Sequence, residues 1–143
     1  MIACFDTSAI VPLLVEEPTS ARCERAWRSA ARVHVAAVTI TETAAALAQA
    51  MRMGRIDARE LDDALLGAEQ LWARCSISPL SAELARRAAR LAVEHGLRGF
   101  DAVRCASGLV MRDVGGVGVG VAGDRAMLDA WRAAGMPVID VTR

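Results

Sequence analysis

"IACFDTS", residues 2–8, begins with four apolar residues and turns polar at Asp6. A short apolar run bounded by polar residues is typical of a strand buried on both faces, as in a parallel sheet. An apolar, helix-like run follows from Ala9 to Val15. We therefore expect Asp6 at the carboxyl end of a first strand, where open α/β sheets bind their ligands. The alternative is that Asp6 only caps the helix that follows, as Asp often does.

Short apolar runs alternate with longer amphipathic segments along the rest of the chain. We expect further strands at residues 33–38, 76–79, 117–122 and 137–141. We expect helices at residues 18–31, 40–53, 57–74, 81–95, 101–112 and 124–135, with Thr39 and Thr41 offering N-cap hydroxyls to the second of these. Alternating strands and helices predict a parallel α/β sheet covered on both faces. Residues 1–143 form one domain, since neither a repeat nor a linker interrupts the pattern.

The charge pattern limits the possible functions. The formal net charge is zero, which argues against a broad basic surface for nucleic acid. All 17 basic residues are Arg and none is Lys, which excludes any mechanism that requires a lysine. A balanced total can still conceal an acidic pocket surrounded by basic surface.

The four cysteines and the N-terminus indicate an ordinary cytoplasmic domain. The cysteines are scattered without a Cys-x-x-Cys pair, so we interpret them as small buried or half-buried hydrophobic residues. No apolar run approaches the roughly 20 residues of a membrane span. The N-terminal residues also lack the basic and hydrophobic segments of a signal peptide. We expect a cytoplasmic protein.

Four acids lie at places where a predicted helix begins. They are Asp6, Glu42, Asp101 and Asp124. The carboxyl ends of parallel strands point the same way, so the helix starts that follow them gather at one edge of the sheet. Carboxylates this close repel one another unless a cation neutralises them, and Mg²⁺ and Mn²⁺ favour such oxygen ligands. The alternative is four independent N-caps on the surface, each of which is plausible alone.

The four acids lie in four longer stretches, which are FDTSAIVPLLVEEP at 5–18, VTITETAAAL at 38–47, LRGFDAVRCA at 97–106 and AGDRAMLDAWRAAGMPVIDV at 122–141. These stretches resemble the acidic blocks of PIN domains, and above all those of the VapC toxins of bacterial toxin–antitoxin pairs. The resemblance implies a PIN-like three-layer α/β/α sandwich with a five-stranded parallel sheet. It also implies a metal-dependent endoribonuclease in which the four acids ligate one or two Mg²⁺ or Mn²⁺ ions. A homodimer, an RNA substrate and a small cognate antitoxin are expected as well.

One position departs from the pattern of the family. PIN domains often carry Thr or Ser two residues before the fourth acid, where Ala122 stands here. A hydroxyl contact to metal-bound water or to substrate is then missing, unless Thr7 or Ser8 supplies it. Arg104 and Arg125, each close to a candidate acid, could contact the scissile phosphate or could equally pair with a neighbouring acid.

The remaining motifs are better explained by structural roles than by catalysis or cofactor binding. Gly118-x-Gly120-x-x-Gly123 matches a dinucleotide fingerprint, but the glycines lie within a predicted strand and indicate close helix packing instead. His34 and His95 have no serine or cysteine motif beside them and are interpreted as structural or surface residues. Phospho-acceptor domains and phosphatases are disfavoured, because both use a lysine that this chain lacks. A PIN nuclease of RNA processing without an antitoxin, and a non-catalytic PIN module, stay as alternatives.

Overall fold

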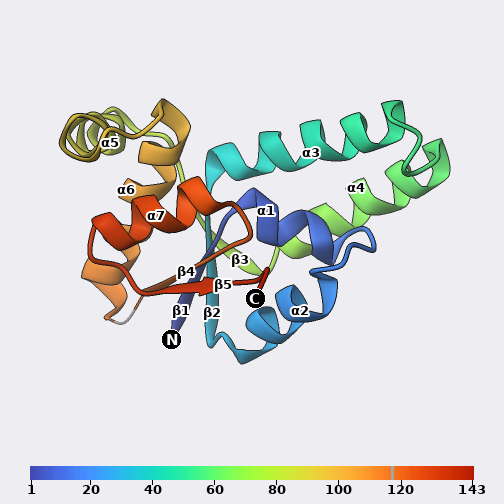
Figure 1. The fold of residues 1–143 in the computed structure, drawn as a ribbon, viewed down its shortest axis with the longest axis horizontal. Coiled ribbons are helices and arrows are strands. Elements are labelled where there is room, and N and C mark those ends of the chain that lie inside the picture. Colours follow the sequence, from blue (N-terminus) through green and yellow to red (C-terminus); the bar gives the residue numbers. More distant parts are fainter. Residues whose placement is uncertain (117) are drawn as a thin grey trace.

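A five-stranded parallel sheet forms the centre of the molecule, with the strand order β3-β2-β1-β4-β5 (Figure 1). The computed structural model describes residues 1–116 and 118–143. The strands are β1 (Ile2–Phe5), β2 (Arg32–Ala36), β3 (Cys75–Ser78), β4 (Gly118–Ala122) and β5 (Val138–Asp140). The predicted parallel α/β sheet is confirmed. Residue 117, the first of the predicted fourth strand, lies outside the described residues.

Helices cover both faces of this sheet. They are α1 (Thr7–Ile10), the 3-10 helix η1 (Val11–Leu13), α2 (Ser20–Ser29), α3 (Ala37–Arg52), α4 (Ala58–Trp72), α5 (Ala82–His95), α6 (Gly99–Gly115) and α7 (Arg125–Ala133). The segments α1, α2 and α4 pack on one face, while α6 and α7 pack on the other and α5 packs on α6. The long helices α3 and α4 lie side by side and extend beyond the sheet (Figure 1). In the described part of the chain, no helix has the length and apolar character that crossing a membrane requires.

The two cores follow from the alternation of side chains along the strands. Ala3 and Phe5 of β1 point into the core under α1, α2 and α4, and Cys4 points into the core under α6 and α7. This alternation is the period-two pattern of a strand buried on both faces. Cys4, Cys23 and Cys105 are buried and Cys75 is half-buried, in agreement with their interpretation as small hydrophobic residues.

The direction in which strands are added to the sheet reverses beside β1. From β1 the chain continues to β2 and β3 on one side, and it later returns to add β4 and β5 on the other side. The place between β1 and β4 is therefore the topological switch point of the sheet. β1 pairs with both β2 and β4 in parallel register. In such sheets the helices leave in opposite directions at the switch point and open a crevice at the carboxyl ends of the strands. Asp6 follows β1 and Asp124 follows β4, so both border this crevice.

The predicted boundary between the second strand and the next helix is wrong. The strand β2 ends at Ala36 and α3 begins at Ala37, so Thr39 and Thr41 lie within the helix and do not cap it. The N-cap is Ala36, which offers no side-chain hydrogen bond, and Thr39 is completely buried. Because apolar residues run from the strand straight into the helix, no polar residue marks the change.

The glycine-rich strand β4 lies directly against a helix. A Cβ atom added at Gly120 would lie 2.3 Å from Cε3 of Trp131 in α7, which is far inside van der Waals contact. Trp131 itself is 1% exposed. Gly120 therefore allows α7 to approach the sheet, in agreement with the interpretation of this motif as close helix packing.

Candidate active site

Asp6 is both a helix cap and a member of the site. One oxygen, Oδ2, accepts hydrogen bonds from the Ser8 backbone N–H at 3.0 Å and from the Ser8 hydroxyl at 2.6 Å, so it caps α1. The other oxygen, Oδ1, faces the guanidinium of Arg104. Asp6 is 3% exposed, which is low for a carboxylate. Asp6 therefore caps α1, but capping is not its only contact, because it also forms an ion pair with Arg104.

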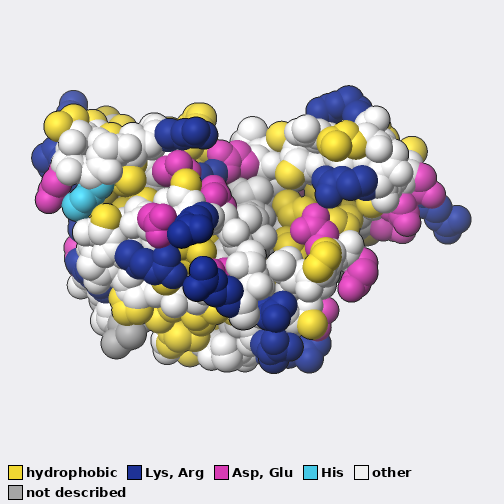
Figure 2. Space-filling view, viewed as in Figure 1, with side chains coloured by type: hydrophobic (Ala, Val, Ile, Leu, Met, Phe, Trp, Pro, Cys, Tyr) yellow, Lys and Arg dark blue, Asp and Glu magenta, His cyan; other side chains and the backbone are white. Residues whose placement is uncertain are grey.

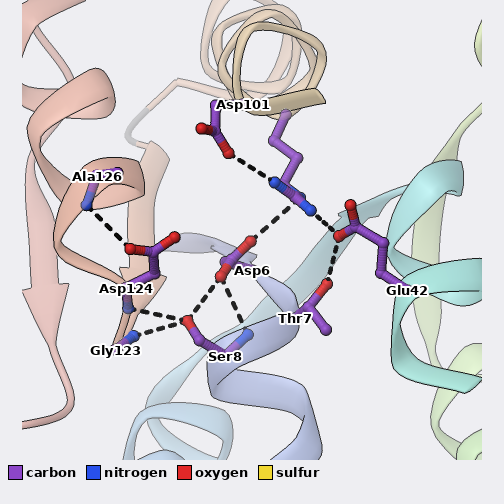
Figure 3. A network of polar contacts seen from close by, with 9 residues as sticks. Asp6, Thr7, Ser8, Glu42, Asp101, Gly123, Asp124 and Ala126 are labelled. Carbon is purple, nitrogen blue, oxygen red and sulfur yellow. Dashed lines mark hydrogen bonds and ion pairs between the residues drawn. The ribbon is translucent and has the colours of Figure 1, made fainter. Parts of the chain in front are cut away.

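The Ser8 hydroxyl joins the first strand to the fourth. It donates to Asp6 and accepts hydrogen bonds from the backbone N–H groups of Gly123 and Asp124, at 2.9 and 3.1 Å (Figure 3). Ala122 is completely buried among apolar side chains and offers no hydroxyl. Ser8 thus places a hydroxyl at the turn after β4, where it binds the backbone.

Glu42 reaches the site from α3. It is the sixth residue of that helix, in its second turn, whereas the sequence predicted it at the helix start. Its Oε2 accepts a hydrogen bond from the Thr7 hydroxyl at 2.9 Å and contacts the guanidinium of Arg104. Thr7 of α1 therefore holds the carboxylate of Glu42, which comes from the neighbouring helix α3 (Figure 3).

Asp101 lies in the first turn of α6, which begins two residues earlier than predicted. Its Oδ1 accepts a hydrogen bond from Nη1 of Arg104 at 2.9 Å, one turn further along the same helix. Arg104 thus forms ion pairs with Asp6, Glu42 and Asp101 together. Of the two roles that the sequence left open for Arg104, this structure contains the pairing with acids.

Asp124 caps α7 and stands at the edge of this cluster. Its Oδ1 accepts a hydrogen bond from the Ala126 backbone N–H at 3.0 Å. The other oxygen lies on the side of Asp6 (Figure 3). Arg125 is exposed next to it, and among the described residues it forms no ion pair with the four acids. Asp124 is the most solvent-exposed of the four candidate acids.

The surroundings of Asp101 disfavour the charged form of its carboxyl group. Burial raises the pKa of Asp101, and the nearby carboxylates of Asp124 and Asp6 raise it further, whereas Arg98 lowers it. The shift is upward although Arg104 donates a hydrogen bond to this carboxylate. Burial and the neighbouring carboxylates therefore disfavour the charged form of Asp101. By formal charge, the carboxylates of the cluster outnumber its one guanidinium.

The residues fit a divalent cation by donor type and by charge. Carboxylate oxygens are the ligands that Mg²⁺ and Mn²⁺ prefer, and three carboxylates here share a single guanidinium, with Asp124 beside them. In the described part of the chain, however, no three Asp, Glu, His or Cys side chains are grouped closely enough to hold one ion as they stand. Arg104 lies between the carboxylates and occupies the space that they share.

Two hollows meet at the acids. A groove of about 1330 Å³ runs between α5, α6 and α7, and Glu42, Asp101 and Asp124 line its edge. A smaller hollow of about 380 Å³ lies on the other side and is lined by Asp6, Thr7 and Ser8. Arg104 and Asp124 border both hollows. Figure 2 shows acidic and arginine side chains close together on this face of the molecule.

The central position of Arg104 and the link made by Ser8 were not predicted. The spacing of Asp101 and Arg104 permits an ion pair on a helix, but the contacts with Asp6 and Glu42 arise only in the folded chain. Glu17 lies in a loop beside the smaller hollow, where Arg55 approaches its carboxylate at 3.7 Å.

Fold and site together define a parallel α/β domain with an acidic site at the sheet's switch point. The family model described as "PIN domain" matches residues 3–110, and the chain belongs to this family. Two relatives from Mycobacterium tuberculosis are each 37% identical to it over 111 residues, which are 78% of this chain and 77% of each relative. They are ribonuclease VapC45 of strain CDC 1551 / Oshkosh and ribonuclease VapC49 of strain ATCC 25618 / H37Rv.

Solved structures share the fold over almost the whole chain. FitAcB from Neisseria gonorrhoeae has a TM-score of 0.72 at 19% identity and covers 100% of this chain and 99% of its own. VapC20 from Mycobacterium tuberculosis, described as a sarcin-ricin loop cleaving toxin, has a TM-score of 0.66 at 24% identity, with coverages of 94% and 95%. VapBC2 from Rickettsia felis, bound to a promoter DNA fragment, has a TM-score of 0.63 at 11% identity, with coverages of 98% and 98%.

Proposed function

We propose that this chain is a divalent-metal-dependent endoribonuclease and the toxin of a toxin–antitoxin pair. The observation that supports this most is the convergence of Asp6, Glu42 and Asp101 from three elements at the switch point, with Asp124 beside them. The relatives named ribonucleases VapC45 and VapC49 support the same activity. The metal is proposed to be Mg²⁺ or Mn²⁺.

The four acids would hold the metal, and residues around them would keep the acids in place. A bound divalent cation neutralises charge on a phosphodiester and lowers the pKa of water. Ser8 holds Asp6 and the turn that carries Asp124, and Thr7 holds Glu42. Arg125 is exposed at the same edge and offers a two-pronged donor to an RNA phosphate.

The two hollows suit a polymeric substrate. A strand of RNA can enter on the α5–α7 side and leave on the α1 side, since Arg104 and Asp124 border both hollows. Single-stranded loops are the expected targets, because their bases and backbone are accessible. Hydrolysis by in-line attack of water would leave a 5′-phosphate and a 3′-hydroxyl.

Cleavage of a mixed pool of structured RNAs by the purified chain, freed of any partner, tests the activity. We expect discrete cuts with Mg²⁺ or Mn²⁺ that disappear with EDTA, with Asp6→Ala and with Asp101→Ala. Glu24→Gln is the matched control, because Glu24 pairs with Arg28 on α2, away from the acid cluster and from both hollows. Cuts that survive EDTA and both alanine variants, or ends that carry a 2′,3′-cyclic phosphate, would contradict the proposal.

The proposed partners are a small antitoxin and a second copy of the chain. Coexpression with the product of a small gene adjacent to the coding locus should give a stable complex that no longer cuts RNA. Size-exclusion chromatography with light scattering would test the homodimer. Active nuclease whose neighbouring genes encode no inhibitor would instead indicate a PIN nuclease of RNA processing.

A further inference from the structure

Arg104 is the counter-ion of the acid cluster. It is 9% exposed, and its guanidinium contacts carboxylates that come from β1, α3 and α6. A buried guanidinium needs such partners, because removal of its charge from water is costly. The same three carboxylates are the proposed metal ligands. One arginine therefore occupies the space between groups that a cation would also need.

The fit of this arginine in the cluster is incomplete. Nη1 donates a well-formed hydrogen bond to Asp101. Nε lies 3.1 Å from Oδ1 of Asp6 but makes no hydrogen bond, and it is buried from water. A buried N–H without an acceptor destabilises the arrangement that contains it. The contact between Arg104 and Asp6 is therefore weaker than its distance suggests.

We infer that Arg104 is an internal counter-ion that competes with divalent cations for the acid cluster and thereby sets the cation affinity of this site. The inference rests on the proposed metal-dependent function and adds a control to it. When a cation binds, the guanidinium gives up Asp6 and Glu42. Part of the negative charge of the cluster is then offset in both states, by the single charge of Arg104 in one and by the double charge of the cation in the other.

The surroundings of Arg104 allow this exchange by a side-chain movement. His34 Nε2 lies 2.8 Å from the Ser107 hydroxyl, which anchors α6 to the sheet one turn after Arg104. The helix therefore stays in place while the long arginine side chain can turn. Arg104 borders both the groove and the smaller hollow, so space for the displaced guanidinium lies next to the cluster.

Binding of Mn²⁺ to the full-length, metal-free chain tests the inference without any measurement of cleavage. The dissociation constant is obtained by electron paramagnetic resonance, which reports free Mn²⁺. An opposite charge within 4–6 Å changes the proton affinity of a carboxylate by about 1–3 pKa units. Loss of the Arg104 charge should change the affinity for Mn²⁺ by a factor of similar size. Arg104→Gln should therefore bind Mn²⁺ at least about tenfold more tightly than the native chain. Arg104→Lys, which keeps the charge, should stay within about threefold of the native value.

Arg87→Gln is the matched control, since it removes an arginine that pairs with Asp113 at 2.7 Å, away from the acid cluster. Its Mn²⁺ affinity should equal that of the native chain. Equal or weaker Mn²⁺ binding by Arg104→Gln would overturn the inference and leave the nuclease proposal intact. RNA cleavage that resists EDTA would refute the proposed metal-dependent activity, whatever the arginine variants do.

A second measurement uses the native chain alone. In ¹⁵N NMR spectra, the Arg104 Nε–H signal is assigned through its scalar couplings to the side-chain and backbone atoms of Arg104. Titration with Mg²⁺, which is diamagnetic, should move this signal in step with binding. An unmoved Arg104 signal at saturating Mg²⁺ would show that the guanidinium keeps its partners, and the exchange would be refuted.

Discussion

Ser8 and Asp124 are 116 residues apart in the chain, and the Ser8 hydroxyl accepts a hydrogen bond from the Asp124 backbone N–H at 3.1 Å. The same hydroxyl accepts from Gly123 and donates to Asp6, so its one donor and two acceptor positions are all used. It thus fixes the distance between the turn after β1 and the turn after β4. These two turns carry two of the four candidate acids.

Replacing Ser8 with Ala should lower both stability and cleavage. The partly buried N–H of Gly123 would lose its acceptor, which costs about 1–3 kcal/mol, whereas the exposed N–H of Asp124 can bind water instead. Asp6 would also be free to turn, so RNA cleavage should fall further than the unfolding free energy suggests. Ser29→Ala, which removes a single hydroxyl bond to Ala26, serves as control in urea unfolding and cleavage assays. Native cleavage by Ser8→Ala would contradict this role.

Replacing Asp101 with Asn should separate activity from stability. Burial and the neighbouring acids raise the pKa of Asp101, so its charge destabilises the folded state at neutral pH. The neutral amide removes that repulsion, and the Tm in EDTA should rise. Cleavage should fall about 100-fold or more, since a proposed metal ligand is lost. A lower Tm in EDTA would show that the ion pair with Arg104 outweighs the repulsion.

Buried His34 makes the stability of the chain depend on pH. Its ring nitrogens lie within hydrogen-bonding distance of the hydroxyls of Ser76, Ser78 and Ser107. Burial lowers the pKa of His34 from 6.5 to about 4. The unfolded chain therefore binds more protons between these pH values, and stability falls as the pH decreases from 6.5 towards 4. Above pH 6.5 the full contribution is present.

Urea unfolding at about pH 7.5 and about pH 5 measures this contribution, which should decrease by about 2 kcal/mol over that interval. The His34→Gln variant keeps a polar side chain but does not titrate, so it isolates the effect of His34 from that of the carboxylates. Its loss of stability over the same interval should be smaller by that amount. Equal losses in the native chain and in His34→Gln would exclude His34 as the cause.

The general architecture could be predicted because local signals agree with the fold. The apolar run before Asp6, the cap at Asp57 and the left-handed Gly96 after α5 each mark a boundary by their own chemistry. At the start of α3 no such marker exists, since Ala36 caps the helix without a side-chain bond. The boundary there depends on packing against the sheet, which no local pattern records.

The candidate site was predictable in its acids but not in its contacts. Asp6, Asp101 and Asp124 lie at helix starts, where the chain order predicts them, so these acids could be named in advance. Glu42 was also named, but it lies in the second turn of α3 and not at its start. Which acid forms an ion pair with a particular arginine depends on side-chain torsion angles and on the distance between α3 and α6. The three ion pairs of Arg104 and the bond from Thr7 to Glu42 therefore required the folded chain.

The close approach of α7 to β4 gives the last prediction. A Cβ atom at position 120 would lie 2.3 Å from the Trp131 ring, which is rigid and buried, so neither neighbour can yield easily. Gly120→Ala should therefore push α7 outward and destabilise the fold by about 1–3 kcal/mol, as overpacking of a core does. Because Asp124 caps α7, the outward shift should also displace this acid and reduce cleavage.

Gly99→Ala is the control for this substitution, because a Cβ there would meet nothing within 4 Å and the residue lies in the first turn of α6. Alanine is the better helix former by up to about 1 kcal/mol, so Gly99→Ala should leave the Tm unchanged or raise it. Thermal unfolding of both variants, followed by circular dichroism, makes the comparison. A Gly120→Ala variant as stable as the native chain would mean that α7 and β4 are less closely packed than this contact requires.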